Sequence, residues 1–305
     1  MRIKRYRHHF TWTPQICGFL LDRAVAEKIE VKTAKHLAAL RLDRAYTPKG
    51  EPIPLLKIET FGGFRLLVNG RPTLSIEKLT PSQQRLFAML ITRQNHHLSI
   101  DEIQSRFWPE ASPQKGRANL DTLISRLKKS IKKAISNVDP SVYLAIRKEK
   151  VVLSNASVVL WTFLHDTHDG LKEHRAGMHR QAVNRFRSAF TLAKGPCFSD
   201  LSDHGPCHEF REYTLGPMAL KAAHAWALSS LELGLPPAGD IDLMERQITV
   251  APESLELVRA IHAMHLQHTT PARADNLLTL YQNRLMDEGM PPSEVDLFLE
   301  NFWKP

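Results

Sequence analysis

The 305-residue sequence lacks the features that define membrane and secreted proteins. No apolar run approaches the roughly 20 residues that a helix needs to cross a bilayer. The basic start MRIKRYRHHF is followed by only a short apolar patch, residues 16–21, which Asp22 ends, so we expect no secretory signal. We therefore predict a cytoplasmic protein that does not associate with membranes.

Cysteine is also scarce. The chain has 3 cysteines, an odd number without the spacing of a disulfide framework, which argues against an oxidising compartment. One pattern, C-x6-H-x2-C-H, has ligand types that suit zinc and consists of Cys197, His204, Cys207 and His208. Its spacing is not that of the usual zinc pairs, and the adjacent Cys207 and His208 would need an awkward geometry. We predict no metal site and no cofactor.

Motifs of catalysis are missing as well. The sequence contains no nucleophile elbow, Walker phosphate loop, dinucleotide-binding fingerprint or HExxH helix. Two histidine–aspartate pairs, His165 with Asp166 and His168 with Asp169, lie one helical turn apart, but polar helix ends commonly produce such clusters. We predict that the protein is not an enzyme. A hydrolase or metal enzyme is the disfavoured alternative, and it would need a deep polar pocket in the second half of the chain.

Positive charge is in excess and unevenly distributed. The net charge is +9, divided as +6 over residues 1–54, +9 over residues 55–155 and −6 over residues 156–305. A basic module joined to an acidic one is typical of a protein in which only the first module meets a polyanion.

Residues 1–54 predict two short amphipathic helices from Phe10 onward, around Ile29-Glu30-Val31, followed by a loop rich in Pro and Gly at residues 47–54. Two helices this short seldom form an independent core. We interpret residues 1–54 as a helical appendage and linker.

From Leu55 the apolar periodicity changes. The stretch LLKIETFGGFRLLVNGRPTL contains two strand-like runs joined at Asn69-Gly70, the preferred pair for a two-residue hairpin, with a bend or bulge at Gly62-Gly63. Three capped helix starts follow, at Thr80, Ser99 and Ser112. The inward-facing residues of the first two helices are Leu86, Phe87, Leu90, Ile91, Ile100, Ile103 and Phe107. Together with the third helix they predict a compact three-helix core.

The third helix, which begins at Ser112-Pro113, carries the functional prediction. Its apolar stripe consists of Leu120, Leu123, Ile124, Leu127 and Ile131. Its opposite face consists of Asn119, Thr122, Ser125, Arg126, Lys129 and Lys133. Hydroxyl and amide groups can read base edges and cations can neutralise phosphates, although a cationic helix face is often only solvated. We predict that this face binds DNA.

The neighbouring segments favour that prediction. Trp108-Pro109 ends the second helix and holds the short turn into the third, a helix-turn-helix arrangement in which the later helix enters the major groove. Two β-prone runs, residues 143–146 and 151–153, predict a hairpin that would form a wing beside this helix. Its cations, which can contact the phosphate backbone or minor groove, are Arg147, Lys148 and Lys150. A charged hairpin tip taken alone is usually only solvated.

From Trp161 the chain reads as successive amphipathic helices without strand alternation. Small residues along them allow close helix packing, as in tetratricopeptide-type hairpins: Ala182, Ala189, Ala222, Ala225, Ala227 and Ala260. This half is interpreted either as plain helical packing or as a surface that holds a protein partner.

Three stretches carry a family resemblance: LKIETFGGFRLLVNGRP, LTPSQQRLFAMLI and LSIDEIQSRFWPEASPQKGRANLDTLISRLKKSI. They resemble the OmpR-type winged helix of SARP-type (antibiotic regulatory protein) transcriptional activators, and the helical half of the chain resembles the bacterial transcriptional activator domain of that family. The resemblance covers about residues 15 to 300 and is strongest to the C-terminal part of large regulators with an upstream ATPase and tetratricopeptide region. The wing IRKEKVVL departs from the family in lacking a glycine-tyrosine pattern.

The resemblance implies a mainly α fold with small β-sheets: a winged-helix DNA-binding domain at residues 55–157 and a tetratricopeptide-like helical domain at residues 158–305. It implies a sequence-specific transcriptional activator that binds double-stranded DNA. It also implies a homodimer, regulation, or contact with RNA polymerase, without distinguishing them. Arg126 and Lys129 match the family's basic positions in the SRLKK run. The alternative is an adaptor whose basic helix binds an acidic protein partner.

Overall fold

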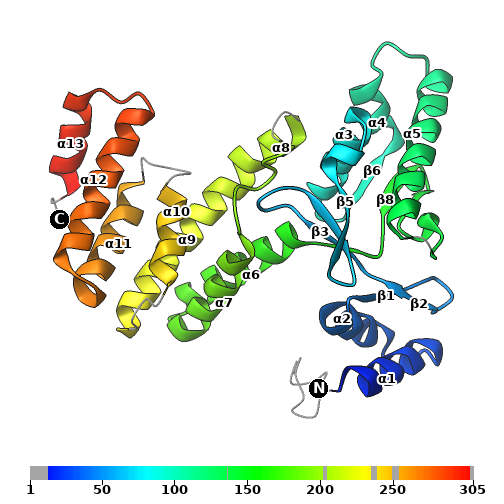
Figure 1. Ribbon diagram of the computed structural model, residues 1–305, viewed down its shortest axis with the longest axis horizontal. Coiled ribbons are helices and arrows are strands. Elements are labelled where there is room, and N and C mark those ends of the chain that lie inside the picture. The colour runs from blue at the N-terminus through cyan, green and yellow to red at the C-terminus, as the bar shows by residue number, and fades with distance from the viewer. Residues whose placement is uncertain (1–12, 136, 202–204, 235–238, 249–253, 303–305) are drawn as a thin grey trace. The chain divides into compact units, whose positions relative to one another are not determined.

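The computed structural model describes residues 13–135, 137–201, 205–234, 239–248 and 254–302 (Figure 1). They divide into two compact units. The first runs to Val159 and also takes in Pro196–Cys207, and the second consists of Leu160–Gly195 and the chain from His208 onward. Over the described residues, no helix is both long enough and apolar enough to cross a bilayer.

The N-terminal segment has both predicted helices, α1 (Pro14–Ala26) and α2 (Val31–Leu42). They share a small core made of Val25, Ala34, Ala38 and Tyr46. The predicted loop at residues 47–54 was wrong in part, because β2 (Pro52–Pro54) pairs antiparallel with β1 (Arg44–Tyr46). Prolines at both ends of β2 are tolerated because a two-stranded ribbon leaves one side of each strand unpaired. Residues 10–12, where the first helix was expected to begin, lie outside the described residues.

A four-stranded sheet follows, with the order β5-β4-β3-β9. Its strands are β3 (Leu56–Glu59), β4 (Arg65–Val68), β5 (Arg71–Ser75) and β9 (Ala156–Val158). The predicted turn at Asn69-Gly70 is confirmed, with φ values of 51° and 74° between two antiparallel strands. The bend or bulge expected at Gly62-Gly63 is a full reversal of the chain between β3 and β4. The register shift lies in the next strand pair, β4 with β5, between Leu66 and Leu67. Strand β9 pairs parallel to β3.

The helices of the first unit are α3 (Pro81–Ile91), α4 (Ile100–Phe107) and α5 (Pro113–Ala134), with the 3-10 turn η1 (Ile76–Lys78) before them. All three predicted caps are confirmed. Thr80 and Gln83 form a capping box, the Ser99 Oγ accepts a 3.1 Å hydrogen bond from the Glu102 amide, and the Ser112 Oγ accepts one of 3.4 Å from the Lys115 amide. The predicted core residues are buried except Phe107. The Phe107 ring is half-buried, and the Arg85 guanidinium covers one face of it, 4.9 Å from the ring centroid.

The wing hairpin is confirmed. After the turn η2 (Pro140–Val142), β7 (Leu144–Arg147) and β8 (Lys150–Leu153) pair antiparallel, which leaves Lys148 and Glu149 as the tip. A third strand that the sequence did not predict, β6 (His97–Ser99), pairs with β8 and completes a sheet of order β6-β8-β7.

Residues 196–201 return to the first unit beside the reversal at Gly62-Gly63. The Gly62 amide donates to the Pro196 carbonyl at 3.0 Å, and the Phe198 amide donates to the Thr60 carbonyl at 2.8 Å. The Asp200 carboxylate accepts from the Phe64 amide at 2.7 and 2.9 Å. A segment more than 130 positions away in sequence therefore supports this turn of the four-stranded sheet.

The second unit is helical in every element that the structure describes, as predicted. Its helices are α6 (Val159–Arg175), α7 (His179–Leu192), α8 (Gly205–Phe210), which enters this unit at His208, the π-helical turn η3 (Arg211–Leu215), α9 (Gly216–Leu233), α10 (Asp240–Ile248), α11 (Leu255–His268), α12 (Pro271–Asp287) and α13 (Pro292–Phe302). The six small residues expected at helix contacts are all buried. The Phe190 ring packs edge-on against Phe163 at 5.4 Å and stacks on Trp226 at 5.4 Å, so α6, α7 and α9 share one core.

Candidate nucleic-acid interface

Helix α5 is held in the first unit by its apolar stripe. All five predicted stripe residues are buried, and the helix packs against α3, α4, β5 and β7 (Figure 1). Its first turns lie close to α4 at the buried Gly116, where a Cβ atom would stand 3.2 Å from the Gln104 side chain. The helix-turn-helix pair is therefore a packed unit with one face of α5 turned outward.

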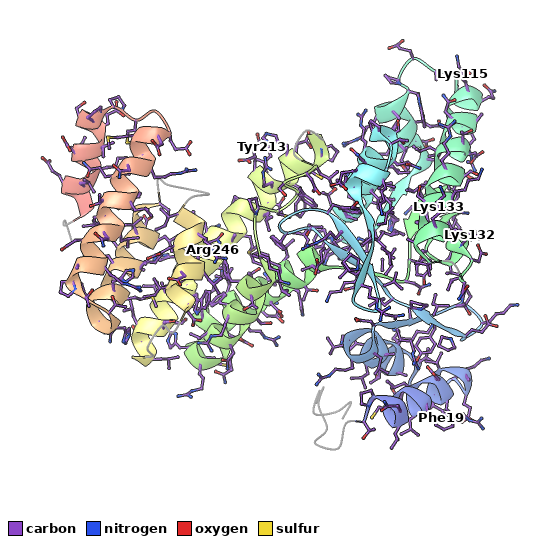
Figure 2. The ribbon with its side chains drawn as sticks, viewed as in Figure 1. Phe19, Lys115, Lys132, Lys133, Tyr213 and Arg246 are labelled. Atoms are coloured by element: carbon purple, nitrogen blue, oxygen red, sulfur yellow. The ribbon has the colours of Figure 1, made fainter. Side chains whose placement is uncertain are left out.

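The outward face of α5 is polar and cationic. Five of the six residues predicted on it are exposed, namely Thr122, Ser125, Arg126, Lys129 and Lys133. Asn119 is half-buried. Two further exposed cations of α5, Lys115 and Lys132, were not assigned from the sequence. Figure 2 shows Lys115 near the start of α5 and Lys132 and Lys133 near its end, so cations follow most of the helix.

Most of these cations form no ion pair with the carboxylates that the structure describes. Within the described part of the chain, no carboxylate forms an ion pair with Lys115, Arg126, Lys129, Lys132 or Lys133. Arg117 differs, because it pairs with Asp121 at 3.4 Å and with Glu149 at 3.0 Å. Lys128 differs too, since its ammonium donates to the Ser141 Oγ at 3.1 Å and so holds η2 against the helix. The unpaired cations are available to phosphate oxygens.

The hydroxyl of Thr122 is partly engaged within α5. Its Oγ1 donates to the Ala118 carbonyl at 3.0 Å, as threonines in helices often do. The oxygen keeps its acceptor capacity and the methyl group remains exposed. Thr122 can therefore accept from a base amino group or contact a thymine methyl group.

The wing tip lies beside the first turns of α5. The three predicted wing cations, Arg147, Lys148 and Lys150, are exposed. The Lys150 ammonium is 3.4 Å from the His97 Nε2 on β6. The Glu149 carbonyl accepts a 3.0 Å hydrogen bond from the Ile100 amide at the start of α4. The hairpin is thus attached at its tip to both helices of the helix-turn-helix pair.

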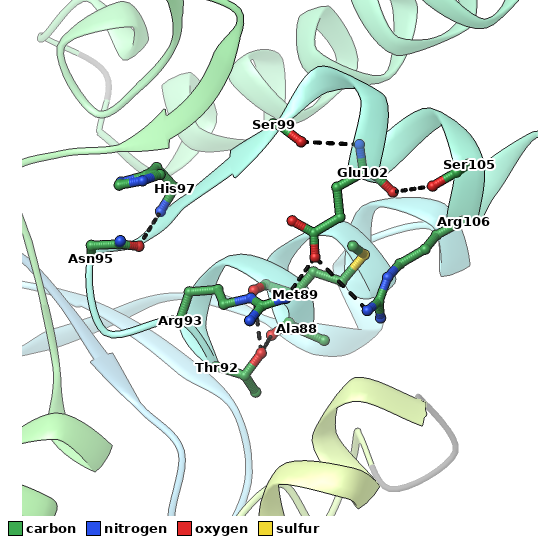
Figure 3. A network of polar contacts seen from close by, with 10 residues as sticks. All are labelled: Ala88, Met89, Thr92, Arg93, Asn95, His97, Ser99, Glu102, Ser105 and Arg106. Atoms are coloured by element: carbon green, nitrogen blue, oxygen red, sulfur yellow. Dashed lines mark hydrogen bonds and ion pairs between the residues drawn. The ribbon is translucent and has the colours of Figure 1, made fainter.

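A polar network fixes α4 against α3, and Figure 3 shows its members from close by. The Glu102 carboxylate pairs with the Arg93 guanidinium at 2.6 Å and with the Arg106 guanidinium at 3.8 Å. The Glu102 backbone amide donates to the Oγ of Ser99, which caps α4. The end of α3, the start of α4 and the last turn of α4 are therefore tied to one side chain. This network supports the platform on which α5 rests.

The residues weighed for metal or enzyme chemistry form no such site where the structure describes them. Cys197 and Cys207 are buried and are not joined in a disulfide, whereas His204 lies outside the described residues. No group of three or more metal-ligating side chains gathers elsewhere in the described ranges. The second unit has a cavity of about 270 Å³ that includes His265, but both ring nitrogens of that buried histidine are engaged, by Glu245 at 2.7 Å and Thr269 at 3.0 Å. The histidine is held in place and offers no free nitrogen.

The sheet, the three helices, the wing and the helices that follow define a winged helix-turn-helix protein with a tetratricopeptide-like helical domain. No family model matches the chain. Over 144 residues it is 28% identical to the transcriptional regulatory protein EmbR of Mycobacterium bovis and of Mycobacterium tuberculosis, a match that covers 47% of this chain and 36% of EmbR. This similarity to a transcriptional regulatory protein agrees with the resemblance stated from the sequence.

The fold agrees with a solved structure of the same relative. Mycobacterium tuberculosis EmbR in complex with a low affinity phosphopeptide matches with a TM-score of 0.58 at 23% identity, covering 81% of this chain and 64% of that one. The sequence match spans little more than a third of EmbR, 36% of its length. These relatives are regulators by name, which fits the expectation of a protein other than an enzyme.

Proposed function

We propose that this chain acts as a transcriptional regulator of the SARP type and that its first unit binds duplex DNA sequence-specifically. One observation carries the proposal. Helix α5 buries five apolar residues on one side and exposes, on the other, cations that have no acidic partner among the described residues. Such a helix can enter the major groove and place Thr122, Ser125 and Arg126 near base edges.

The dimensions of α5 suit this role. An α-helix is about 10–12 Å across with its side chains, and the major groove of B-DNA is about 12 Å wide. Lys129 and Lys133 follow the three base-edge residues along α5, towards its C-terminal end, so we assign them to the phosphates. The wing cations would hold the neighbouring backbone in the same way.

The uneven charge of the chain supports different functions for its basic and acidic parts. Residues 1–54 carry +6 and residues 55–155 carry +9, whereas residues 156–305 carry −6, so only the part of the chain before residue 156 is attractive to DNA. We assign the helical domain to dimerisation or to contact with regulatory partners such as RNA polymerase. The role of activator rests on the family resemblance, and such a regulator would work in the cytoplasm.

Selection of bound duplexes from a random library, with the full chain as bait, tests the proposal. We expect a defined sequence to be enriched and to bind at least about 10³-fold more tightly than random duplex, with an affinity that falls as salt rises. Two half-sites in tandem would indicate a head-to-tail dimer, and an inverted pair a two-fold dimer.

The adaptor alternative gives a different result in the same assay. An adaptor would enrich no sequence, would depend little on duplex length, and would form a stoichiometric complex with an acidic protein in the absence of DNA. That outcome would refute the regulator proposal.

A further inference from the structure

The two acidic residues of the candidate interface both form ion pairs with the same cation. Helix α5 contains one acid, Asp121, and the wing hairpin (residues 144–153) contains one acid, Glu149. Both pair with Arg117, at 3.4 Å from its Nε and 3.0 Å from its Nη1. Arg117 is therefore neutralised in the free protein, whereas the other exposed cations of α5 have no carboxylate partner within the described residues.

The wing turn holds Glu149 against α5. Lys148 and Glu149 have φ values of 47° and 57°, the left-handed values that a two-residue hairpin of this type requires at both central positions. From this turn the Glu149 carboxylate accepts a 3.0 Å hydrogen bond from the Arg117 Nη1.

We propose that Glu149 acts as an electrostatic latch on Arg117, which makes Arg117 a further phosphate-contacting residue. In the free protein the Glu149 carboxylate is paired with the Arg117 guanidinium. In the complex a DNA phosphate takes the place of that carboxylate. This inference rests on the proposed function. A guanidinium donates hydrogen bonds to carboxylate and to phosphate oxygens alike, so the two anions compete for the same N–H groups.

The pair is suited to exchange because it is solvent-exposed. The side chains of Arg117 and Glu149 are 39% and 80% exposed, so water screens their attraction and the pair is weak. Asp121 lies on α5 itself and stays near Arg117 in either state. The latch therefore lowers the affinity for every duplex, because each must displace Glu149 before Arg117 can bind phosphate.

A double-mutant cycle in the full chain tests the latch. The variants are Glu149→Gln, Arg117→Ala and both together, and the probe is a fluorescently labelled random-sequence duplex titrated at two salt concentrations. We expect Glu149→Gln to bind about two- to fivefold more tightly, the range that an exposed ion pair supplies. Arg117→Ala should bind more weakly and flatten the slope of log affinity against log salt by about 0.9. In the Arg117→Ala background, the gain from Glu149→Gln should disappear.

Glu110→Gln is the matched control, since Glu110 is an exposed carboxylate in the turn before α5. Its effect should be the same with and without Arg117. Thermal unfolding of each variant should match that of the unmodified chain, which shows that folding is unchanged.

Three results would overturn the latch. An equal gain from Glu149→Gln in both backgrounds would indicate general charge repulsion. Weaker binding by Glu149→Gln would show that Glu149 instead positions the wing for DNA binding. If the unmodified chain retains no duplex at all, the latch and the proposed function both fail, whereas retention of duplex without tighter binding by Glu149→Gln defeats the latch alone.

Discussion

The phenol of Tyr143 donates a 2.7 Å hydrogen bond to the carbonyl of Pro54. It joins the start of the wing hairpin to the chain just before the four-stranded sheet. Tyr143 is completely buried, and burial raises its pKa to about 12. The wing is therefore anchored in the first unit at its base by Tyr143 and at its tip by Glu149.

Replacing Tyr143 with Phe should lower the free energy of unfolding by about 1–2 kcal/mol, because the Pro54 carbonyl loses its donor. The pH dependence has a definite sign. The folded-state pKa lies above the ordinary value of 10, so the stability that Tyr143 contributes is complete below about pH 10 and is lost as the pH rises towards 12.

Denaturant unfolding of both proteins from about pH 9 to pH 12 measures this effect. The decline should be smaller in Tyr143→Phe. Part of the decline should remain, because burial also raises the pKa of Tyr46. Parallel curves for the two proteins would show that Tyr143 ionises equally easily in the folded and unfolded states.

Gly170→Ala should destabilise the second unit although alanine is the better helix former. A Cβ atom at Gly170 of α6 would stand 2.7 Å from the Phe186 ring of α7. The gain in helix propensity is about 1 kcal/mol, whereas overpacking costs about 1–3 kcal/mol, so we expect a net loss. Gly205→Ala is the control, because nothing lies within 4 Å of its Cβ position. Thermal unfolding that ranks Gly170→Ala at or above the unmodified chain would contradict this close approach of α6 and α7.

Asp240→Asn should loosen α10 from α7. The Arg187 guanidinium holds the Asp240 carboxylate at 3.0 Å through Nε and 2.7 Å through Nη2, and the carboxylate is only 7% exposed. The loss of a charge-assisted pair should cost about 1.5–3 kcal/mol. Arg187→Lys should also destabilise, because an ammonium cannot make both bonds. The exposed neighbour Asp242→Asn is the control, and equal denaturation midpoints for the two aspartate variants would refute the prediction.

Two substitutions on the outer face of α5 separate base contacts from phosphate contacts. Arg126→Ala should weaken binding to the selected sequence by about 1–3 kcal/mol and relax specificity. Lys133→Ala should weaken all duplexes similarly and reduce the salt slope by about 1. Gel-shift titrations at two salt concentrations distinguish them. Unchanged affinity in Arg126→Ala would remove that residue from the reading face.

Much of the first unit could be predicted because its signals are local. A cap such as Ser112 acts on an amide three residues away, and the stripe from Leu120 to Ile131 repeats with the period of a single helix. The Asn69-Gly70 turn likewise depends only on its own backbone. The assignment of particular side chains to DNA stays a prediction, since it depends on a partner as well as on the fold.

The sequence by itself determined where α3, α4 and α5 begin, which face of α5 is buried and where the wing hairpin folds, because caps, periodicity and turns act over a few residues. Only the tertiary structure decided that β9 pairs beside β3, that Asp200 supports the turn before Phe64, and that Glu149 meets Arg117. These contacts join segments from 32 to more than 130 positions apart. Their partners are selected by the packing of the whole unit, which no local pattern of residues encodes.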